Sequence, residues 1–80
     1  MQITYRYYNS WEDWAETIPR TLFRTLHEGS NFPVDEQAWS KTDQAWVPTT
    51  RVTESIFRGG DVEPTTEEFA RKHFPEAFAK

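Results

Sequence analysis

The sequence predicts one small α+β domain spanning residues 1–80, in which a small antiparallel sheet packs against two helices. Three observations support this fold class. Aromatic residues alternate with polar ones near the N-terminus, a segment near the C-terminus carries helix start and stop signals, and no linker or low-complexity tract divides the chain. A chain of this length forms one domain at most.

The first expected element is a strand at about residues 2–8. Ile3, Tyr5 and Tyr7 are separated by single polar residues, which is the period-2 pattern of a half-buried strand. Tyrosine and isoleucine are also common in strands because their side chains pack well on a pleated surface.

A helix is expected next, at about residues 11–28. A Ser-x-x-Asp pattern that starts at Ser10 resembles a capping box with Asp in place of the usual Glu. Leu22 and Leu26 are four residues apart, as expected for the core-facing side of a helix. Pro19 lies inside this segment, so we expect the helix to kink or restart there.

A second helix is expected at about residues 66–74. Thr65 is the expected N-cap, Glu68 its capping-box partner, and Pro75 the residue that stops the helix. Between the two helices, a strand is expected at about residues 50–57, because this segment is rich in β-branched residues and ends at a Gly-Gly pair.

The tripeptide Gln-Ala-Trp occurs twice, seven residues apart, and allows two interpretations. In a hairpin over residues 36–48, a turn at Thr42-Asp43 would place Trp39 directly across from Trp46, and such aromatic pairs stabilise sheets. In a helix capped by Asp35, the two tryptophans would share a face, but polar residues would interrupt that face. We favour the hairpin and leave the helix open.

Composition limits the classes of function. The chain has 13 acidic and 9 basic residues, a net charge of −4, 16% aromatic residues and no cysteine. The negative charge disfavours nucleic acid as a general partner. Neither a secretory signal nor a membrane span is recognisable, so we expect a soluble protein without a membrane partner. The expected compartment is the cytoplasm, that of the host cell if the protein is viral.

No pattern predicts an enzyme. His27 and His73 are the only imidazoles, they lie far apart in the sequence, and neither belongs to a recognisable metal-binding motif. The chain lacks a cysteine nucleophile and a Gly-x-Ser-x-Gly motif. We therefore expect a non-enzymatic protein without a catalytic residue, a metal or another cofactor.

Tryptophans and acidic residues are the candidates for a binding surface. Tryptophan is enriched among the residues that dominate binding energy, and acidic charge steers association with a basic partner. The tryptophans can equally serve as core residues, and the acidic residues can equally favour a helix N-terminus. The candidate protein-binding residues are Trp11, Glu12, Asp13, Trp14, Glu16, Trp39, Asp43 and Trp46.

We therefore predict a small acidic protein-binding module, an inhibitor or adaptor, whose partner carries a basic nucleic-acid-binding surface. In size and charge the chain resembles compact acidic inhibitors that phages encode against host defence or nucleic-acid machinery, such as anti-CRISPR proteins. That resemblance implies an inhibitor.

Two other functions stay open at this point. Tyr5, Arg6, Tyr7 and Tyr8 combine stacking rings with a cation on a predicted strand, which is typical of a site for single-stranded nucleic acid. Alternatively, the protein is a structural or assembly subunit. A homodimer is also open, because an aromatic-rich domain of this size can need a second copy to complete its core.

Overall fold

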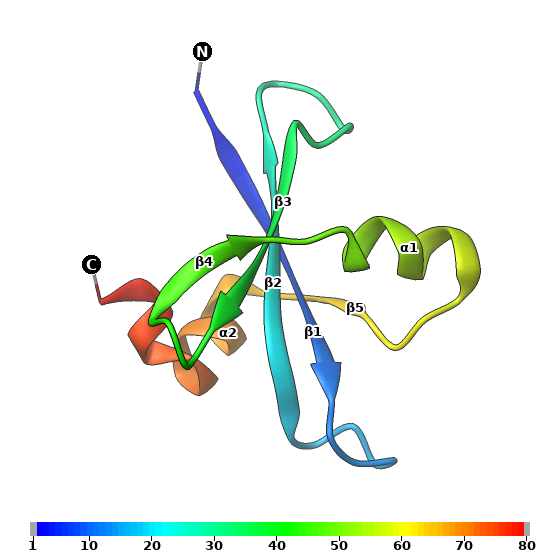
Figure 1. Ribbon diagram of the computed structural model, residues 1–80, viewed down its shortest axis with the longest axis vertical. Helices are drawn as coiled ribbons and strands as arrows, with labels where there is room; N and C mark the ends of the chain where they lie inside the picture. The colour runs from blue at the N-terminus through cyan, green and yellow to red at the C-terminus, as the bar shows by residue number, and fades with distance from the viewer. Residues whose placement is uncertain (1, 80) are drawn as a thin grey trace.

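The computed structural model describes residues 2–79, which form a five-stranded antiparallel sheet, two α-helices and one short 3-10 helix (Figure 1). The strand order in the sheet is β4-β3-β2-β1-β5. The predicted α+β class is therefore confirmed. The elements in chain order are β1 (Thr4–Trp11), β2 (Pro19–His27), β3 (Asp35–Ser40), β4 (Ala45–Pro48), α1 (Arg51–Arg58), β5 (Glu63–Thr65), α2 (Glu67–His73) and η1 (Pro75–Phe78).

The N-terminal strand is confirmed, but the helix predicted at 11–28 is wrong. That segment contains the end of β1, a loop at residues 12–18, and β2, which pairs with β1 along its length. A spacing of four residues also keeps side chains on one face of a strand, so Leu22 and Leu26 fit both structures. Pro19 is tolerated because it is the first residue of its strand.

The strand predicted at 50–57 is also wrong, because this segment forms helix α1. Val52 alone of the helix is buried, and the hydroxyl of Thr50 donates to the Glu54 carboxylate at 2.8 Å across the first turn. Gly59 ends the helix with a φ of 70°, and its N–H donates to the carbonyl of Ser55. The Gly-Gly pair therefore terminates a helix, where glycine commonly adopts the left-handed conformation.

The hairpin at the repeated tripeptide is confirmed. β3 and β4 are antiparallel, and Trp39 pairs with Trp46 in the expected register. The turn is longer than predicted: residues 41–44 form it, and Gln44 takes a φ of 52°. The two indole rings meet edge to face, with centroids 5.6 Å apart.

The C-terminal helix is confirmed as α2, with its N-cap one residue later than predicted. Thr66, and not Thr65, is the N-cap, and its hydroxyl accepts a hydrogen bond from the Phe69 N–H at 3.1 Å. The residues just before this cap form β5, a short edge strand that the sequence did not predict. Pro64 suits that position because an edge strand can accommodate a residue without an N–H.

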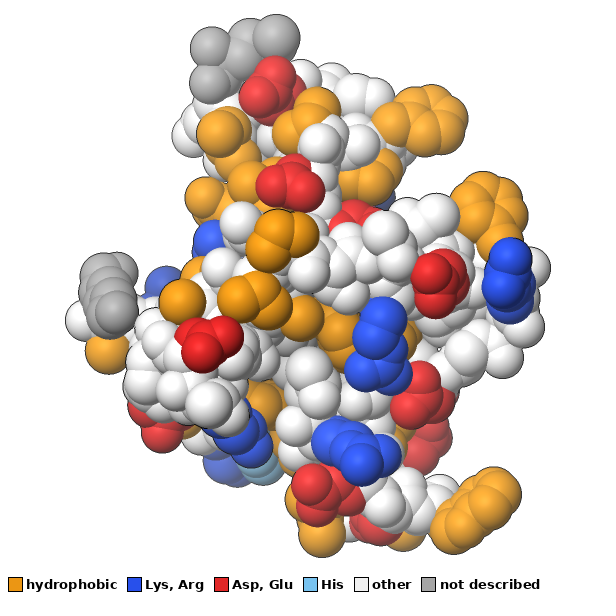
Figure 2. Space-filling view, viewed as in Figure 1, with side chains coloured by type: hydrophobic (Ala, Val, Ile, Leu, Met, Phe, Trp, Pro, Cys, Tyr) orange, Lys and Arg blue, Asp and Glu red, His pale blue; other side chains and the backbone are white. Residues whose placement is uncertain are grey.

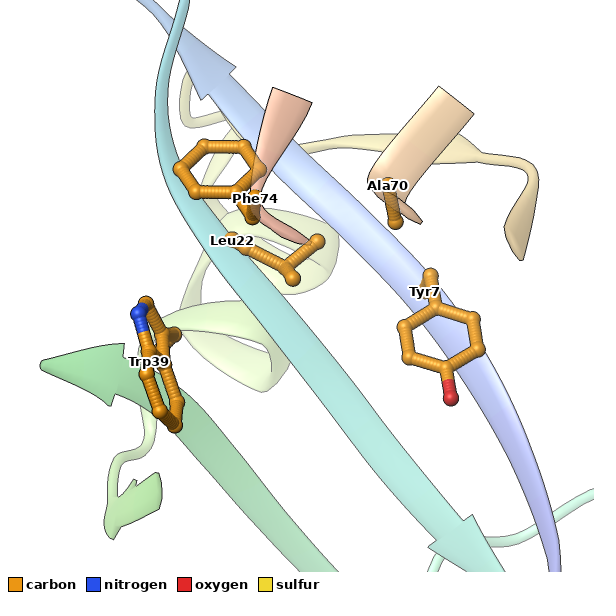
Figure 3. Packing of buried hydrophobic residues seen from close by; sticks show 5 residues of the cluster. All are labelled: Tyr7, Leu22, Trp39, Ala70 and Phe74. Atoms are coloured by element: carbon orange, nitrogen blue, oxygen red, sulfur yellow. The ribbon is translucent and has the colours of Figure 1, made fainter. Parts of the chain in front are cut away.

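The main core lies between one face of the sheet and the α2–η1 segment. Figure 3 shows Tyr7, Leu22 and Trp39 on three neighbouring strands, with Ala70 and Phe74 next to them. Phe74 is 2% exposed and Leu22 is fully buried. Helix α1 lies on the other side of the β1–β2 pair from α2 (Figure 1).

The opposite face of β2 is also buried. Phe23 is fully buried, and the guanidinium carbon of Arg51 on α1 lies 5.0 Å from the centre of its ring. Thr25 and His27 on this face bond to each other at 2.8 Å, and the other ring nitrogen of His27 lies 3.0 Å from the Ser30 carbonyl. A central strand buried on both faces explains the consecutive apolar residues of β2.

Candidate functional site

The loop between β1 and β2 is held in shape by one carboxylate. One oxygen of Asp13 accepts the N–H groups of Thr17, at 2.9 Å, and Ile18, at 3.0 Å, and its other oxygen accepts the hydroxyl of Thr17. Between the strand ends, the N–H of Glu12 donates to the carbonyl of Ile18 at 2.9 Å. The loop therefore has a defined shape, although its residues belong to no helix or strand.

These hydrogen bonds favour the ionised form of Asp13. They hold its pKa below the ordinary value, first through the Thr17 hydroxyl and then through the Ile18 N–H. Asp13 was predicted as a contact for a partner. In the structure its carboxylate is the acceptor that shapes the loop, and it holds the neighbouring loop residues in place.

Two tryptophans lie at this end of the sheet in different environments. Trp14, in the loop, is fully exposed. Trp11, at the end of β1, is half-buried and meets the ring of Phe69 on α2 edge to face, with centroids 5.9 Å apart. Its indole N–H donates to the carboxylate of Glu63 on β5 at 3.0 Å. A large, exposed ring on a braced loop is well suited to contact a partner.

Next to these rings lies an open hollow of 490 Å³, which we call the acidic hollow. It combines two indole rings with five carboxylates from the loop, β5 and the segment before β5. Figure 2 shows acidic and hydrophobic side chains side by side over this end of the molecule. The lining residues are Trp11, Glu12, Asp13, Trp14, Glu16, Asp61 and Glu63.

Two of these carboxyl groups are close enough to affect each other. A hydrogen bond with Glu63, and then charge repulsion from it, raise the pKa of Glu16 above its ordinary value. Glu16 also takes a φ of 56°, a left-handed conformation that is uncommon outside glycine. When both groups are ionised, they repel each other, so a cation placed between them would be stabilising.

The structure thus brings together Trp11, Glu12, Asp13, Trp14 and Glu16, as the sequence analysis grouped them, and adds Asp61 and Glu63. The two added acids were missed because β5 was not predicted. Asp61 also forms an ion pair with Arg51 at 3.3 Å.

The remaining predicted protein-binding residues lie elsewhere. Trp39 is 6% exposed and belongs to the core, and Trp46 is half-buried beside it. Asp43 is exposed in the β3–β4 turn, where its N–H donates to the Ser40 hydroxyl at 3.1 Å. None of the three lines the acidic hollow.

The four residues proposed for nucleic-acid binding do not form one stacking surface. Tyr7 is 8% exposed and packs against Phe78, with ring centroids 5.5 Å apart. Burial raises its pKa above the ordinary value, and the nearby charge of Glu67 adds to this. Arg6 points to the other face, where it donates to the Asn31 side chain at 2.8 Å. A second hollow is nevertheless lined by all four residues, Tyr5, Arg6, Tyr7 and Tyr8.

Comparison with known proteins gave no relative: no protein-family model, curated protein or solved structure matches the chain. Both α-helices formed by residues 2–79 are too short to cross a membrane. Within the same residues, no three side chains of His, Asp and Glu are grouped in a way that could hold a metal ion.

Proposed function

We propose that this protein is a small binding module whose acidic hollow, together with Trp14, docks onto a basic surface of a partner protein. The observation that supports this most directly is the meeting of Glu16 and Glu63, from two separate segments, next to a fully exposed tryptophan. Five carboxylates and two indole rings in one open hollow match the chemistry of lysine and arginine side chains.

The fit to a basic side chain has two parts. The aliphatic stem of a lysine or arginine packs against an indole ring, and its charged end reaches the carboxylates beyond the ring. Placing that cation near Glu16 and Glu63 relieves the repulsion between the two carboxylates. This stabilises the bound state relative to the free protein. Because hydrogen bonds to Asp13 already fix the shape of the β1–β2 loop, less conformational entropy is lost on binding.

A basic surface of this kind often belongs to a protein that binds nucleic acid. We propose that the module acts as an inhibitor, because a bound acidic domain would occupy a surface that otherwise meets phosphates. The net charge of −4 agrees with this role, since it favours approach to a basic partner.

The test starts from the partner that the tagged protein retains from its native host, followed by affinity measurements on the purified pair. Glu16→Lys should weaken binding at least tenfold, since it reverses one charge inside the hollow. Glu28→Lys is the matched control: it makes the same charge change at an exposed position outside the hollow and should have little effect.

Salt dependence completes the experiment. Affinity of the wild-type protein should fall as salt rises, and that dependence should be shallower for Glu16→Lys. Equal losses for Glu16→Lys and Glu28→Lys would contradict the proposed site, because only net charge would then matter. Binding that is independent of salt and of both substitutions would overturn the acidic docking surface itself.

A further inference from the structure

Strand β1 is longer than the strand that covers its outer edge. β2 pairs with β1 from Thr4 to Trp11 on one side, whereas β5 on the other side pairs only with Tyr7–Asn9. Within residues 2–79, the first part of β1, residues 4–6, thus has a strand partner on one side only. The unpaired length is roughly 10 Å at 3.3 Å per residue.

The position of Pro64 shows which backbone groups face this open edge. Tyr8 lies opposite Pro64, and a proline has no N–H with which to form the paired hydrogen bonds of an antiparallel ladder. Tyr8 is therefore at a non-hydrogen-bonded position, and the N–H and C=O of Tyr7 point toward β5. The direction of the backbone N–H and C=O groups alternates from one strand residue to the next. Those of Tyr5, two residues before Tyr7, therefore also point outward along this edge.

A hollow of 470 Å³ lies along this edge, and we call it the edge hollow. Its lining residues are Tyr5, Arg6, Tyr7, Tyr8, Pro64, Thr65 and Glu67. Successive strand residues point to opposite faces, so a hollow on one face would be lined by alternate residues of β1 only. Four consecutive residues line this one, which places it along the strand edge, where β5 ends.

We propose that the edge hollow binds an extended peptide segment of a partner protein, which adds a strand to β1 in line with β5. Strand addition of this kind obtains affinity from main-chain hydrogen bonds and specificity from alternate side chains. The outward N–H and C=O of Tyr5 supply the hydrogen bonds, and its ring, 42% exposed, supplies a surface for an apolar or aromatic side chain. Glu67 also lines the hollow, where its carboxylate forms an ion pair with Arg71 at 3.0 Å.

A short peptide fits this edge better than a second copy of the chain does. Symmetric pairing of two β1 edges would join only residues 4–6 of each copy, and so short a contact buries far less than the roughly 1,200 Å² of a stable interface. A flexible peptide can follow the edge from Tyr5 toward Thr65, where β5 ends. The edge hollow shares no lining residue with the acidic hollow, so the two proposals are independent.

The test uses short linear peptides selected from a displayed random library against the intact protein. Binding of a selected peptide is then compared between Tyr5→Val and Tyr5→Pro. Both substitutions remove the ring and its contact with Arg24, but only proline removes the outward N–H. Since that N–H points away from β2, the β1–β2 pairing should survive, and thermal melts check that both variants fold.

Tyr5→Pro should bind the peptide about tenfold more weakly than Tyr5→Val, as expected for loss of a main-chain hydrogen bond and a steric block at the edge. In the wild-type protein, peptide binding should slow hydrogen exchange at the Tyr5 amide. This second readout tests the proposal even if Tyr5→Pro fails to fold.

Three results would overturn the proposal. The first is failure of the library to yield any peptide that protects the Tyr5 amide. The second is equal affinity of folded Tyr5→Pro and Tyr5→Val for a peptide that does not protect this amide. The third is protection of Tyr5 that grows with protein concentration in the absence of peptide, which would identify a second copy as the occupant.

Discussion

The four tryptophans form two pairs, each with one half-buried ring, whose other ring is buried in the first pair and exposed in the second. Trp39 and Trp46 face each other across the β3–β4 hairpin, and Trp39 is 6% exposed. Trp11 and Trp14 lie at the end of β1 and in the following loop, and Trp14 is fully exposed next to five carboxylates. One residue type thus serves the core at one site and the surface at another.

The difference follows from what covers each pair. The first pair lies on the sheet face that α2 and η1 cover, where Phe74, Ala77 and Phe78 pack against the same cluster. The second pair lies where β1 ends, and Trp14 is in a loop whose shape depends on polar hydrogen bonds to Asp13. Burial, and not residue type, therefore separates core tryptophans from candidate binding residues.

The largest effect is expected at the buried member of the hairpin pair. Trp39→Ala should lower the free energy of unfolding by about 3–5 kcal/mol, because it leaves a cavity in the main core. That is a large part of the roughly 4–12 kcal/mol expected for a domain of this length. Denaturant unfolding followed by circular dichroism measures the change.

Trp39→Phe provides the matched control. The indole N–H of Trp39 is buried and finds no acceptor among the residues that the structure describes. Since phenylalanine keeps a large ring and removes this unpaired group, it should lose less stability than alanine does. Equal losses for both substitutions would show that the indole itself is required.

A smaller loss is expected at the half-buried member of the same pair. The guanidinium carbon of Arg24 lies 4.0 Å from the centre of the Trp46 ring and 4.6 Å from the centre of the Tyr5 ring. The Nε of Arg24 donates to the side-chain oxygen of Gln37 at 2.8 Å. Trp46→Ala removes the cross-strand ring pair and one of these cation–π contacts, which together contribute about 1–2 kcal/mol. Chemical denaturation again measures it, and a loss as large as that of Trp39→Ala would contradict the division between core and rim.

The sequence predicted the fold class and the elements whose signals were specific. The β3–β4 hairpin followed from pairing Trp39 with Trp46, and α2 followed from its cap and its stop at Pro75. The strand predicted in place of α1 rested on β-branched residues and the Gly-Gly pair, whereas the helix predicted in place of β2 rested on apolar residues four apart. Four is an even number close to one helical turn, so this spacing fits strand and helix alike.

Only part of the acidic hollow was predicted from the sequence. Trp11, Glu12, Trp14 and Glu16 are neighbours in the sequence, so any local structure keeps them together. Glu63 reaches the same place only because β5 pairs with the end of β1, a contact between residues more than fifty positions apart. Local sequence patterns carry no direct signal for such pairing.

The shape of the loop under Trp14 should depend on pH through Asp13. Hydrogen bonds lower the pKa of Asp13 in the folded protein, so their stabilising effect is fully present above its unfolded pKa of about 4. The effect is lost as pH falls through the lowered pKa. Asp13→Asn, which retains the geometry without the charge, should therefore be slightly less stable than wild type at pH 6.

Thermal melts of the two proteins at several pH values measure this difference. The difference in Tm should begin to shrink below about pH 4, where the unfolded carboxylate becomes protonated, and should be lost below the lowered pKa of folded Asp13. Glu16→Gln offers a contrast of opposite sign, because a hydrogen bond with Glu63, and then repulsion from it, raise the pKa of Glu16, so that ionisation there is unfavourable. A difference between Asp13→Asn and wild type that is constant with pH would rule out the charge as its cause.

The smallest effect on stability is expected at Trp14, the most exposed of the four tryptophans. Trp14→Ala should change the free energy of unfolding by no more than about 0.5 kcal/mol, since an exposed ring loses almost nothing when it is truncated. Incorporation of 5-fluorotryptophan gives an independent check by fluorine NMR. The resonance lost in Trp14→Ala should be the one most sensitive to replacement of H₂O by D₂O, whereas that of Trp39 should be insensitive.

Trp14→Ala also separates folding from binding in a way that the hairpin pair cannot. Because the substitution leaves the core and the Asp13 hydrogen bonds intact, any loss of affinity for a basic partner reports the ring itself. Large free energies of binding concentrate in a few aromatic residues, so that loss should exceed tenfold. A destabilised Trp14→Ala would instead mean that the ring packs on the loop, and the two pairs of tryptophans would then be alike.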